Sequence, residues 1–221
     1  MKSLVQKIYP ETALNYRLIS LSNDLLKGKE VSNTRFDKMY PSIIRKLSSV
    51  YWTTVEVVQK AASLLIFQEG DKILDVGSGC GKFCIIGAAS YPMAHFYGIE
   101  QRSHLNEIAN RSAKNLNLSN VTFLEGNMMT LDWSEFDSFY LFNPFFENKM
   151  QAHRRIDLSV PATQDRYDFY IETVHAKLAR LKKGTRVVTY HGFGGDFPQN
   201  YELQHKEKAG TSELELWIKK S

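Results

Sequence analysis

The stretch LDVGSGCG, residues 74–81, decides the fold of this chain of 221 residues. Its strand-like start carries an acidic residue, and glycine then occupies every second position. Glycine tolerates a left-handed backbone and has no side chain, so the chain can turn sharply and approach a ligand closely. A helical pattern follows, and the start of a helix offers free backbone N–H groups. The stretch therefore predicts a ligand-binding turn between a strand and a helix.

Two common glycine loops do not fit this spacing. A dinucleotide-binding loop reads Gly-x-Gly-x-x-Gly, and Lys82 stands where its third glycine is required. A Walker phosphate loop ends in Gly-Lys-Ser/Thr, whereas Gly81 and Lys82 are followed by Phe83. The pattern therefore argues against both of these ligand classes.

The acidic residue followed by Gly-x-Gly-x-Gly resembles motif I of the class I, Rossmann-like methyltransferases that use S-adenosylmethionine (SAM). The resemblance implies that the loop wraps the methionine and ribose part of SAM, with an acidic residue near the cationic amino group. The cofactor-binding residues that it implies in the loop are Asp75, Gly77, Ser78, Gly79 and Gly81.

Two later turns extend this resemblance. Glu100, followed by Gln101, ends the second expected strand, where the family holds both ribose hydroxyls with an acidic residue. Asn127 and Met128 follow the third expected strand, where the family binds adenine. There Asn127 would bond the exocyclic amine and Met128 would pack on the ring. We therefore expect SAM as the cofactor, with these four residues in contact with it.

Strands alternate with helices around the loop, which predicts a layered α/β sheet with helices on both faces. Apolar runs predict strands at residues 72–77, 95–100, 121–127, 136–143 and 185–192. Amphipathic patterns predict helices at residues 81–91, 104–118 and 166–184, with Gly184 as the C-terminal stop. Residues 201–210 and 213–221 would add a final antiparallel pair to this mostly parallel sheet.

The chain before the loop is helical in pattern. We expect residues 1–65 to form an N-terminal helical cap on a methyltransferase domain of residues 66–221, since the cap is too small for a core of its own. One helical stretch ends around Gly28, another starts at Pro41, and Thr53 or Thr54 caps a third.

The segment from Arg45 to Glu56 resembles the helical lid ahead of the catalytic core in the non-SET histone-lysine methyltransferases. The resemblance is architectural, because the characteristic loop sequence of those enzymes is not reproduced. It implies that Tyr51 and Thr53 lie over the cofactor.

The stretch LFNPFFE, residues 141–147, ends the fourth expected strand, where this fold presents the acceptor to the SAM methyl group. Asn143, Pro144 and Phe146 resemble the Asn-Pro-Pro-aromatic loop of amine methyltransferases, with Phe145 in place of the second proline. In those families the Asn oxygen and a proline carbonyl accept hydrogen bonds from a planar amine. The candidate catalytic residues are Asn143, which would also contact the cofactor, Phe145, Phe146 and Glu147.

Several roles stay open at this stage. The two phenylalanines either line an amine channel or pack in the core, and Glu147 is either a proton acceptor or a surface carboxylate. His191, after the fifth strand, is either a base or a loop histidine. A basic cluster at residues 153–155 either meets an acidic substrate or is solvated. Cys80 and Cys84 are expected to pack behind the loop.

The leading hypothesis is a SAM-dependent methyltransferase that N-methylates an amine on a protein or another macromolecule. The alternatives are a small-molecule O- or C-methyltransferase and a SAM-binding protein without catalysis. A net charge of +4, scattered along the chain, argues against a nucleic-acid acceptor. Two cysteines without metal-ligand or disulfide spacing, and no apolar run of the roughly 20 residues that span a bilayer, predict a cytoplasmic protein without a metal or a membrane partner.

Overall fold

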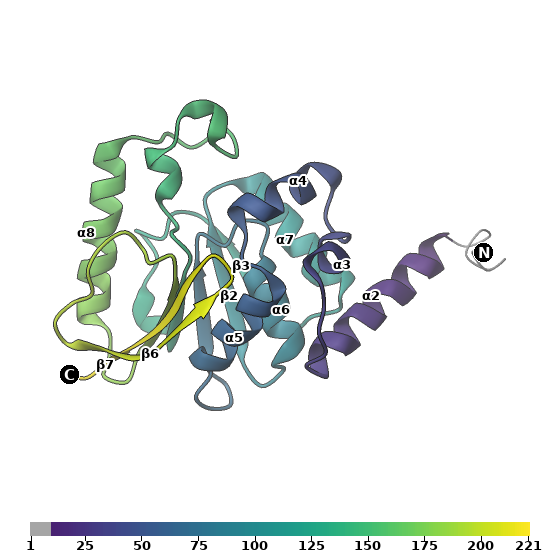
Figure 1. The fold of residues 1–221 in the computed structure, drawn as a ribbon, viewed down its shortest axis with the longest axis horizontal. Coiled ribbons are helices and arrows are strands. Elements are labelled where there is room, and N and C mark those ends of the chain that lie inside the picture. Colours follow the sequence, from purple (N-terminus) through teal and green to yellow (C-terminus); the bar gives the residue numbers. More distant parts are fainter. Residues whose placement is uncertain (1–9) are drawn as a thin grey trace.

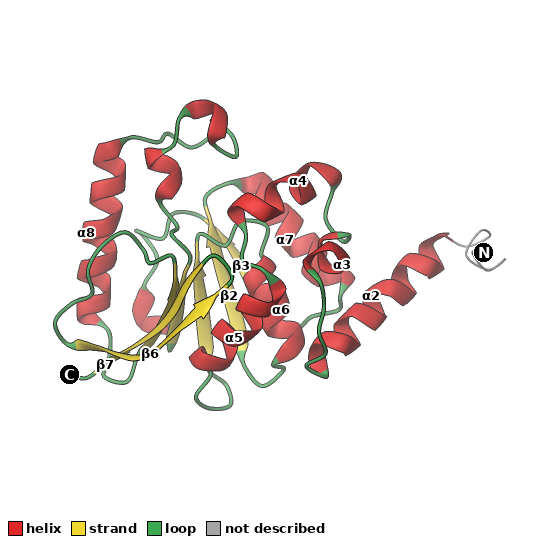
Figure 2. Ribbon diagram, viewed as in Figure 1, coloured by secondary structure: helices red, strands yellow, loops and turns green. Residues whose placement is uncertain are grey.

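The computed structural model describes residues 10–221 and contains a seven-stranded sheet with helices on both faces (Figure 1, Figure 2). The strand order is β3-β2-β1-β4-β5-β7-β6. Strands β1 to β5 pair in parallel, and β7 pairs antiparallel with both β5 and β6. The strands span β1 (Lys72–Val76), β2 (His95–Glu100), β3 (Val121–Glu125), β4 (Ser138–Leu141), β5 (Arg186–Tyr190), β6 (Tyr201–Ala209) and β7 (Ser212–Lys219). The mixed, mostly parallel sheet that the sequence predicts is confirmed.

Helices α5, α6 and α7 lie on one face of the sheet, and α8 lies on the other, at the left of Figure 1. The helices span α2 (Pro10–Leu26), α3 (Asn33–Asp37), α4 (Ser42–Tyr51), α5 (Val55–Leu65), α6 (Lys82–Ser90), α7 (Ser103–Asn115) and α8 (Gln164–Arg180), with short 3₁₀ turns η1 (Trp133–Glu135), η2 (Phe146–Lys149) and η3 (Ala152–Arg154). Within residues 10–221, no helix combines the length and apolar character needed to cross a bilayer.

Each face of the sheet has its own cluster of buried apolar side chains. Ile73 and Leu74, adjacent on β1, belong to opposite clusters because successive side chains of a strand point to opposite faces. The covering helices therefore exclude water from both faces of β1, which gives the glycine loop at its end a rigid support.

The helices before β1 pack on the sheet helices. The apolar side of α2 is buried in the same cluster as α6, and Lys82 of α6 forms a buried ion pair with Asp37 of α3 (Nζ–Oδ1 2.8 Å). The cap expected from residue 1 onward includes residues 1–9, which lie outside the described residues.

The two candidate caps of α5 have different roles. The Thr54 hydroxyl accepts a hydrogen bond from the Val57 N–H (3.5 Å) and caps the helix. The Thr53 hydroxyl is buried and shares a 2.7 Å hydrogen bond with the Tyr140 hydroxyl of β4. Thr53 therefore connects the segment before α5 to the centre of the sheet.

Two predicted helix ends are wrong. Helix α7 ends at Asn115 rather than at residue 118, because Asn117 adopts a left-handed conformation (φ 53°) that stops the helix. Helix α8 ends at Arg180 rather than at Gly184, because Leu181 is already extended. Gly184 instead turns the chain into β5, with its N–H donating to the Lys219 carbonyl (2.9 Å).

Candidate active site

A cavity of about 440 Å³ opens at the carboxyl edge of the sheet. Parallel α/β sheets bind ligands at this edge, and the volume falls within the range of roughly 300–1,000 Å³ found for small-molecule sites. The predicted site residues that line it are Tyr51, Thr53, Gly77, Gly79, Glu100, Gln101, Met128, Asn143, Phe145, Phe146 and Glu147. The cavity therefore brings together residues from the glycine loop, the segment before α5 and the chain after β4.

The glycine loop forms the floor of the cavity. Gly77 and Gly79 both have left-handed backbone (φ 81° and 54°). A Cβ atom at Gly79 would lie 2.5 Å from the Trp52 ring nitrogen, and one at Gly77 would lie 3.2 Å from the Pro144 Cβ. Glycine is therefore required at both positions by conformation and by space, since Trp52 and Pro144 pack directly on the loop.

Glu100 holds the loop from the end of β2. One of its carboxylate oxygens accepts from the Gly79 N–H (3.0 Å), and the other accepts from the Arg102 N–H (2.9 Å). Burial raises the pKa of Glu100 above its ordinary value, and these N–H groups and the Arg102 guanidinium oppose that shift. The side chain thus presents a buried hydrogen-bond acceptor at the cavity wall.

Arg102 organises a cluster of carboxylates that the sequence does not predict. Its guanidinium lies 2.9 Å from Glu147 and 3.2 Å from Asp157, and only 9% of the residue is exposed. The second oxygen of Glu147 accepts from the Ile156 N–H (2.7 Å). The chain after β4 is thereby fixed to the end of β2, and the Glu147 carboxylate has a cationic partner.

Four predicted cofactor residues do not line the cavity: Asp75, Ser78, Gly81 and Asn127. Asp75 lies behind the loop, 3.9 Å from the Cys84 sulfur, and burial together with Glu100 raises the pKa of its carboxyl to about 8. Ser78 is also buried, and its hydroxyl has no hydrogen-bond partner among the described residues. Cys80 and Cys84 are both buried.

The Asn127 side chain is engaged inside the protein. Its amide donates to the Gln101 side chain (3.2 Å) and to the Tyr170 hydroxyl (3.1 Å), and its oxygen accepts from the Met129 N–H (3.0 Å). The sequence does not predict this role for Tyr170 of α8, because a tyrosine on an amphipathic helix has the pattern of a core residue. Asn127 therefore connects α8 to the turn at Gln101.

The chain leaves β4 through an unusual backbone conformation. Asn143 has φ 40°, its N–H donates to the Gly192 carbonyl (2.9 Å), and its carbonyl accepts from the Phe146 N–H (3.2 Å). Among the side chains that the structure describes, none forms a hydrogen bond with the Asn143 amide. Asn143 is thus a lining residue of the cavity, and its amide has no partner among the described side-chain hydrogen bonds.

The two phenylalanines of this turn differ. Phe145 is buried and stacks on Tyr170, with ring centroids 4.9 Å apart and planes at 16°. Phe146 is 44% exposed at the cavity. Phe145 is thus packed against α8, and Phe146 is the apolar side chain at the opening.

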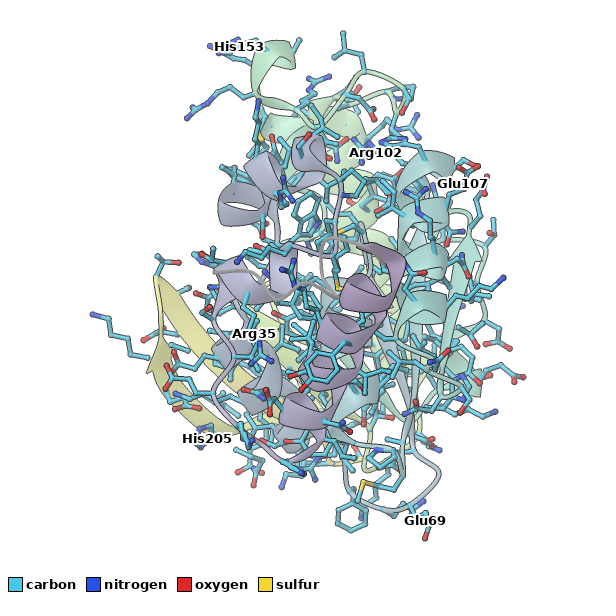
Figure 3. The ribbon with its side chains drawn as sticks, turned by 90° about the vertical axis from the view of Figure 1, so that its right-hand side faces the viewer. Arg35, Glu69, Arg102, Glu107, His153 and His205 are labelled. Atoms are coloured by element: carbon cyan, nitrogen blue, oxygen red, sulfur yellow. The ribbon has the colours of Figure 1, made fainter. Side chains whose placement is uncertain are left out.

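The connection after η2 covers the cavity. The Tyr51 hydroxyl donates to the Arg154 carbonyl, so the end of α4 contacts this connection. Figure 3 shows His153 at the tip of the molecule, on the same end as Arg102 and opposite Glu69. Arg155 donates to the carbonyls of Met150 and Ala162 (3.0 and 3.3 Å). Of the basic cluster, His153 and Arg154 are exposed and Arg155 holds the connection together.

The chemistry of this lining fits SAM. The glycine loop offers bare backbone, Glu100 offers acceptors for hydroxyl groups, and the buried Met128 offers an apolar surface for a ring. Within the lining, the carboxylates outnumber the guanidinium, which suits a cationic sulfonium ligand.

Comparisons with known proteins agree with this fit. The family described as "Methyltransferase domain" matches residues 67–211. A protein-L-isoaspartate O-methyltransferase of Methanothrix thermoacetophila is 35% identical over 80 residues, which are 36% of this chain and 38% of that protein. The match thus spans well under half of the relative's length.

Two solved structures share the fold. An RNA methyltransferase of Salinibacter ruber in complex with S-adenosyl-L-homocysteine has a TM-score of 0.54 at 21% identity, covering 75% of this chain and 91% of that one. TrmN of Thermus thermophilus has a TM-score of 0.58 at 20% identity, covering 76% of this chain and 49% of that one. The family match includes the glycine loop, Glu100 and the turn after β4, and the chain therefore belongs to the methyltransferase domain family, with a Rossmann-like fold.

Proposed function

We propose that this methyltransferase transfers the methyl group of SAM to an amine nitrogen on a protein or another macromolecule, and that Asn143 orients the acceptor. The observation that carries the proposal is the left-handed backbone of Asn143 at the cavity (φ 40°). Such a conformation costs about 1–3 kcal/mol and clusters at functional sites, where the surroundings hold it. Here the Gly192 carbonyl holds it, while the side-chain amide is left without an internal partner and can bond an acceptor amine.

The proposed cofactor site follows the ends of β1 and β2. Gly77 and Gly79 would lie along the methionine part, Glu100 would accept from the ribose hydroxyls, and Gln101 and Met128 would border the adenine. When bound, SAM supplies an electrophilic methyl group on a sulfonium centre.

The residues around that site would have supporting roles. Asp75, Ser78 and Gly81 would brace the loop from behind, and Asn127 would hold Gln101 in place. The helices before β1 would act as a cap, with Tyr51 and Thr53 excluding water from the cavity. Glu147 would hold the covering connection through Arg102.

Glu100→Gln should weaken SAM binding about tenfold, because a hydrogen bond to a charged acceptor contributes about 1.5–3 kcal/mol and an amide replaces only part of it. Titration calorimetry with SAM measures the change. Glu125→Gln is the matched control, since Glu125 pairs with Glu100 in register on β3 but lies outside the cavity lining. Equal SAM affinity in both variants would remove Glu100 from the cofactor site.

Methyl-labelled SAM incubated with the enzyme and fractionated cell lysate tests the acceptor class. We expect label in the protein fraction that survives mild alkali, because N-methyl groups are stable there whereas methyl esters hydrolyse. Heat-inactivated enzyme is the control for background transfer. Label that mild alkali releases, or label confined to nucleic acid or small molecules, would contradict the proposal.

A further inference from the structure

One wall of the cavity is aromatic. It consists of Phe142, Tyr190 and His191 and is called the aromatic wall. Phe142 follows β4, and the other two residues lie at the end of the neighbouring β5. The ring centroids are 5.3 Å apart for Phe142 and Tyr190, 5.6 Å for Phe142 and His191, and 4.6 Å for Tyr190 and His191. All three residues line the cavity beside Asn143, so they border the space where an acceptor would meet the methyl group.

The charges of the cavity indicate which acceptor this wall would receive. Apart from His191, the charged lining residues are Glu100, Glu147 and Arg102. Arg102 donates its backbone N–H to Glu100, and its guanidinium forms ion pairs with Glu100 and Glu147. Within the lining, no cation is therefore left for an anionic group, and no carboxylate is left without a partner. Aromatic faces attract an ammonium ion within about 6 Å of the ring centre. The aromatic wall thus suits an aliphatic ammonium group.

A chain of hydrogen bonds determines which His191 nitrogen carries a proton. The Tyr190 hydroxyl donates its single proton to the Ala209 carbonyl (2.9 Å). The Tyr190 oxygen also accepts from the Thr211 backbone N–H (3.1 Å), and in its 3.2 Å contact with the Thr211 hydroxyl we assign Thr211 as the donor because the Tyr190 proton is already used. The Thr211 oxygen must in turn accept from His191 Nε2 at 3.2 Å. His191 is therefore protonated on Nε2, and Nδ1 keeps a free lone pair.

The surroundings of His191 keep this lone pair available. The backbone of His191 is left-handed (φ 61°), and the neighbours of its ring are Phe142 after β4, Tyr190 of β5 and Thr211 of the turn between β6 and β7. Of these neighbours only Tyr190 carries an ionisable group, and among the described side chains the histidines with a carboxylate at ion-pair distance are His104 and His205, not His191. Burial lowers the pKa of His191 below its ordinary value, so the neutral imidazole predominates at pH 7.

We propose that the acceptor reaches this wall as an aliphatic ammonium ion and that His191 Nδ1 takes its proton. The inference rests on the proposed amine acceptor and names its chemical class and its base. An N–H bond of the ammonium breaks, the proton goes to Nδ1, and the electron pair stays on the amine nitrogen. That nitrogen forms a bond to the methyl carbon while the carbon–sulfur bond breaks and its electron pair goes to sulfur. The products are a methylated ammonium ion and S-adenosylhomocysteine, and the exposed imidazolium returns its proton to solvent.

The test uses n-butylamine as the acceptor and follows the formation of S-adenosylhomocysteine against pH. His191→Asn suits the left-handed backbone but removes the base. We expect its kcat/KM to be about 100-fold below that of the wild type at pH 7. The deficit should shrink to a few-fold near pH 10.4, the approximate pKa of an aliphatic ammonium, where about half of the amine is already deprotonated. SAM affinity should be unchanged.

Further variants separate chemistry from structure. Thr211→Val, which removes the acceptor for Nε2–H, should lower kcat at pH 7 by a smaller factor than His191→Asn. Phe142→Leu should raise the KM for n-butylamine roughly tenfold, and Phe142→Tyr should not. A His191→Asn deficit that is constant with pH, or no deficit at all, would overturn the assignment of the base. Failure to methylate n-butylamine would overturn the ammonium site, whereas alkali-stable label on lysate protein would still support an amine acceptor.

Discussion

Asn143→Ala should lower methyl transfer at least about 100-fold while SAM affinity stays within about twofold of the wild type. The reason is geometric, since methyl transfer is an in-line displacement whose rate depends mainly on how the acceptor is aligned, and loss of alignment costs factors of this size. The glycine loop and Glu100, which would hold the cofactor, make no hydrogen bond to the Asn143 side chain. Transfer of labelled methyl groups and titration calorimetry with SAM measure the two effects separately.

The backbone of Asn143 requires a second variant. Alanine is less tolerant of φ 40° than asparagine, so Asn143→Ala combines loss of the amide with added strain. Asn143→Gly removes the amide and relieves the strain, and we expect it to be as inactive as the alanine variant. Full activity in the glycine variant would show that only the backbone turn matters. Full activity in both variants would exclude Asn143 from the mechanism.

The placement of residues at the sheet edge can be predicted from the sequence where it depends on local pattern. The glycine loop and Glu100 each follow a short apolar strand, and adjacent parallel strands bring their carboxyl ends to one edge of the sheet. Their meeting at the cavity therefore follows from the alternation of strands and helices. The turn after β4 lies at the same edge of the sheet, because β4 is parallel to β1 and pairs with it.

The parts that the sequence does not predict depend on how distant segments pass one another. Arg102 and Glu147 form their ion pair only because the chain after β4 folds back over the end of β2. Phe145 and Phe146 are identical in type, yet Phe145 is buried because it stacks on Tyr170 of the distant α8, whereas Phe146 begins the 3₁₀ turn η2 and is exposed. Neither the ion pair nor the different burial of the two phenylalanines can be predicted from a pattern in the sequence.

Lys82, which stands where a dinucleotide-binding loop has its third glycine, has a structural role in this chain. It breaks the dinucleotide-binding pattern, and in the structure its side chain is 2% exposed and reaches α3 and α4. Its ammonium group donates to Asp37 (2.8 Å), Ser48 (3.1 Å) and Asn33 (3.2 Å). The first residue of α6 thus attaches the helices before β1 directly behind the glycine loop.

Lys82→Met should lower the free energy of unfolding by about 3–5 kcal/mol, because removing one partner leaves the buried Asp37 carboxylate without a cation. For a chain of this length that corresponds to a fall in Tm of roughly 6–20 °C. SAM affinity should also fall, since α4 leads into Trp52, which packs on Gly79. Chemical denaturation and calorimetry measure both effects.

Two further variants test whether the loss of stability comes from the buried ion pair between Lys82 and Asp37. Lys60→Met removes solvent-accessible pairs with Glu207 (3.4 Å) and Glu56 (3.5 Å) and should lower the free energy of unfolding far less than Lys82→Met does. The double variant Lys82→Met/Asp37→Leu removes both buried charges and should recover most of the lost stability, because an apolar pair of similar volume can replace a buried ion pair. If Lys82→Met is no less stable than Lys60→Met, the attachment of α3 to α6 does not depend on this ion pair. If the double variant is as unstable as Lys82→Met alone, the loss comes from packing around the lysine chain and not from the unpaired Asp37 carboxylate.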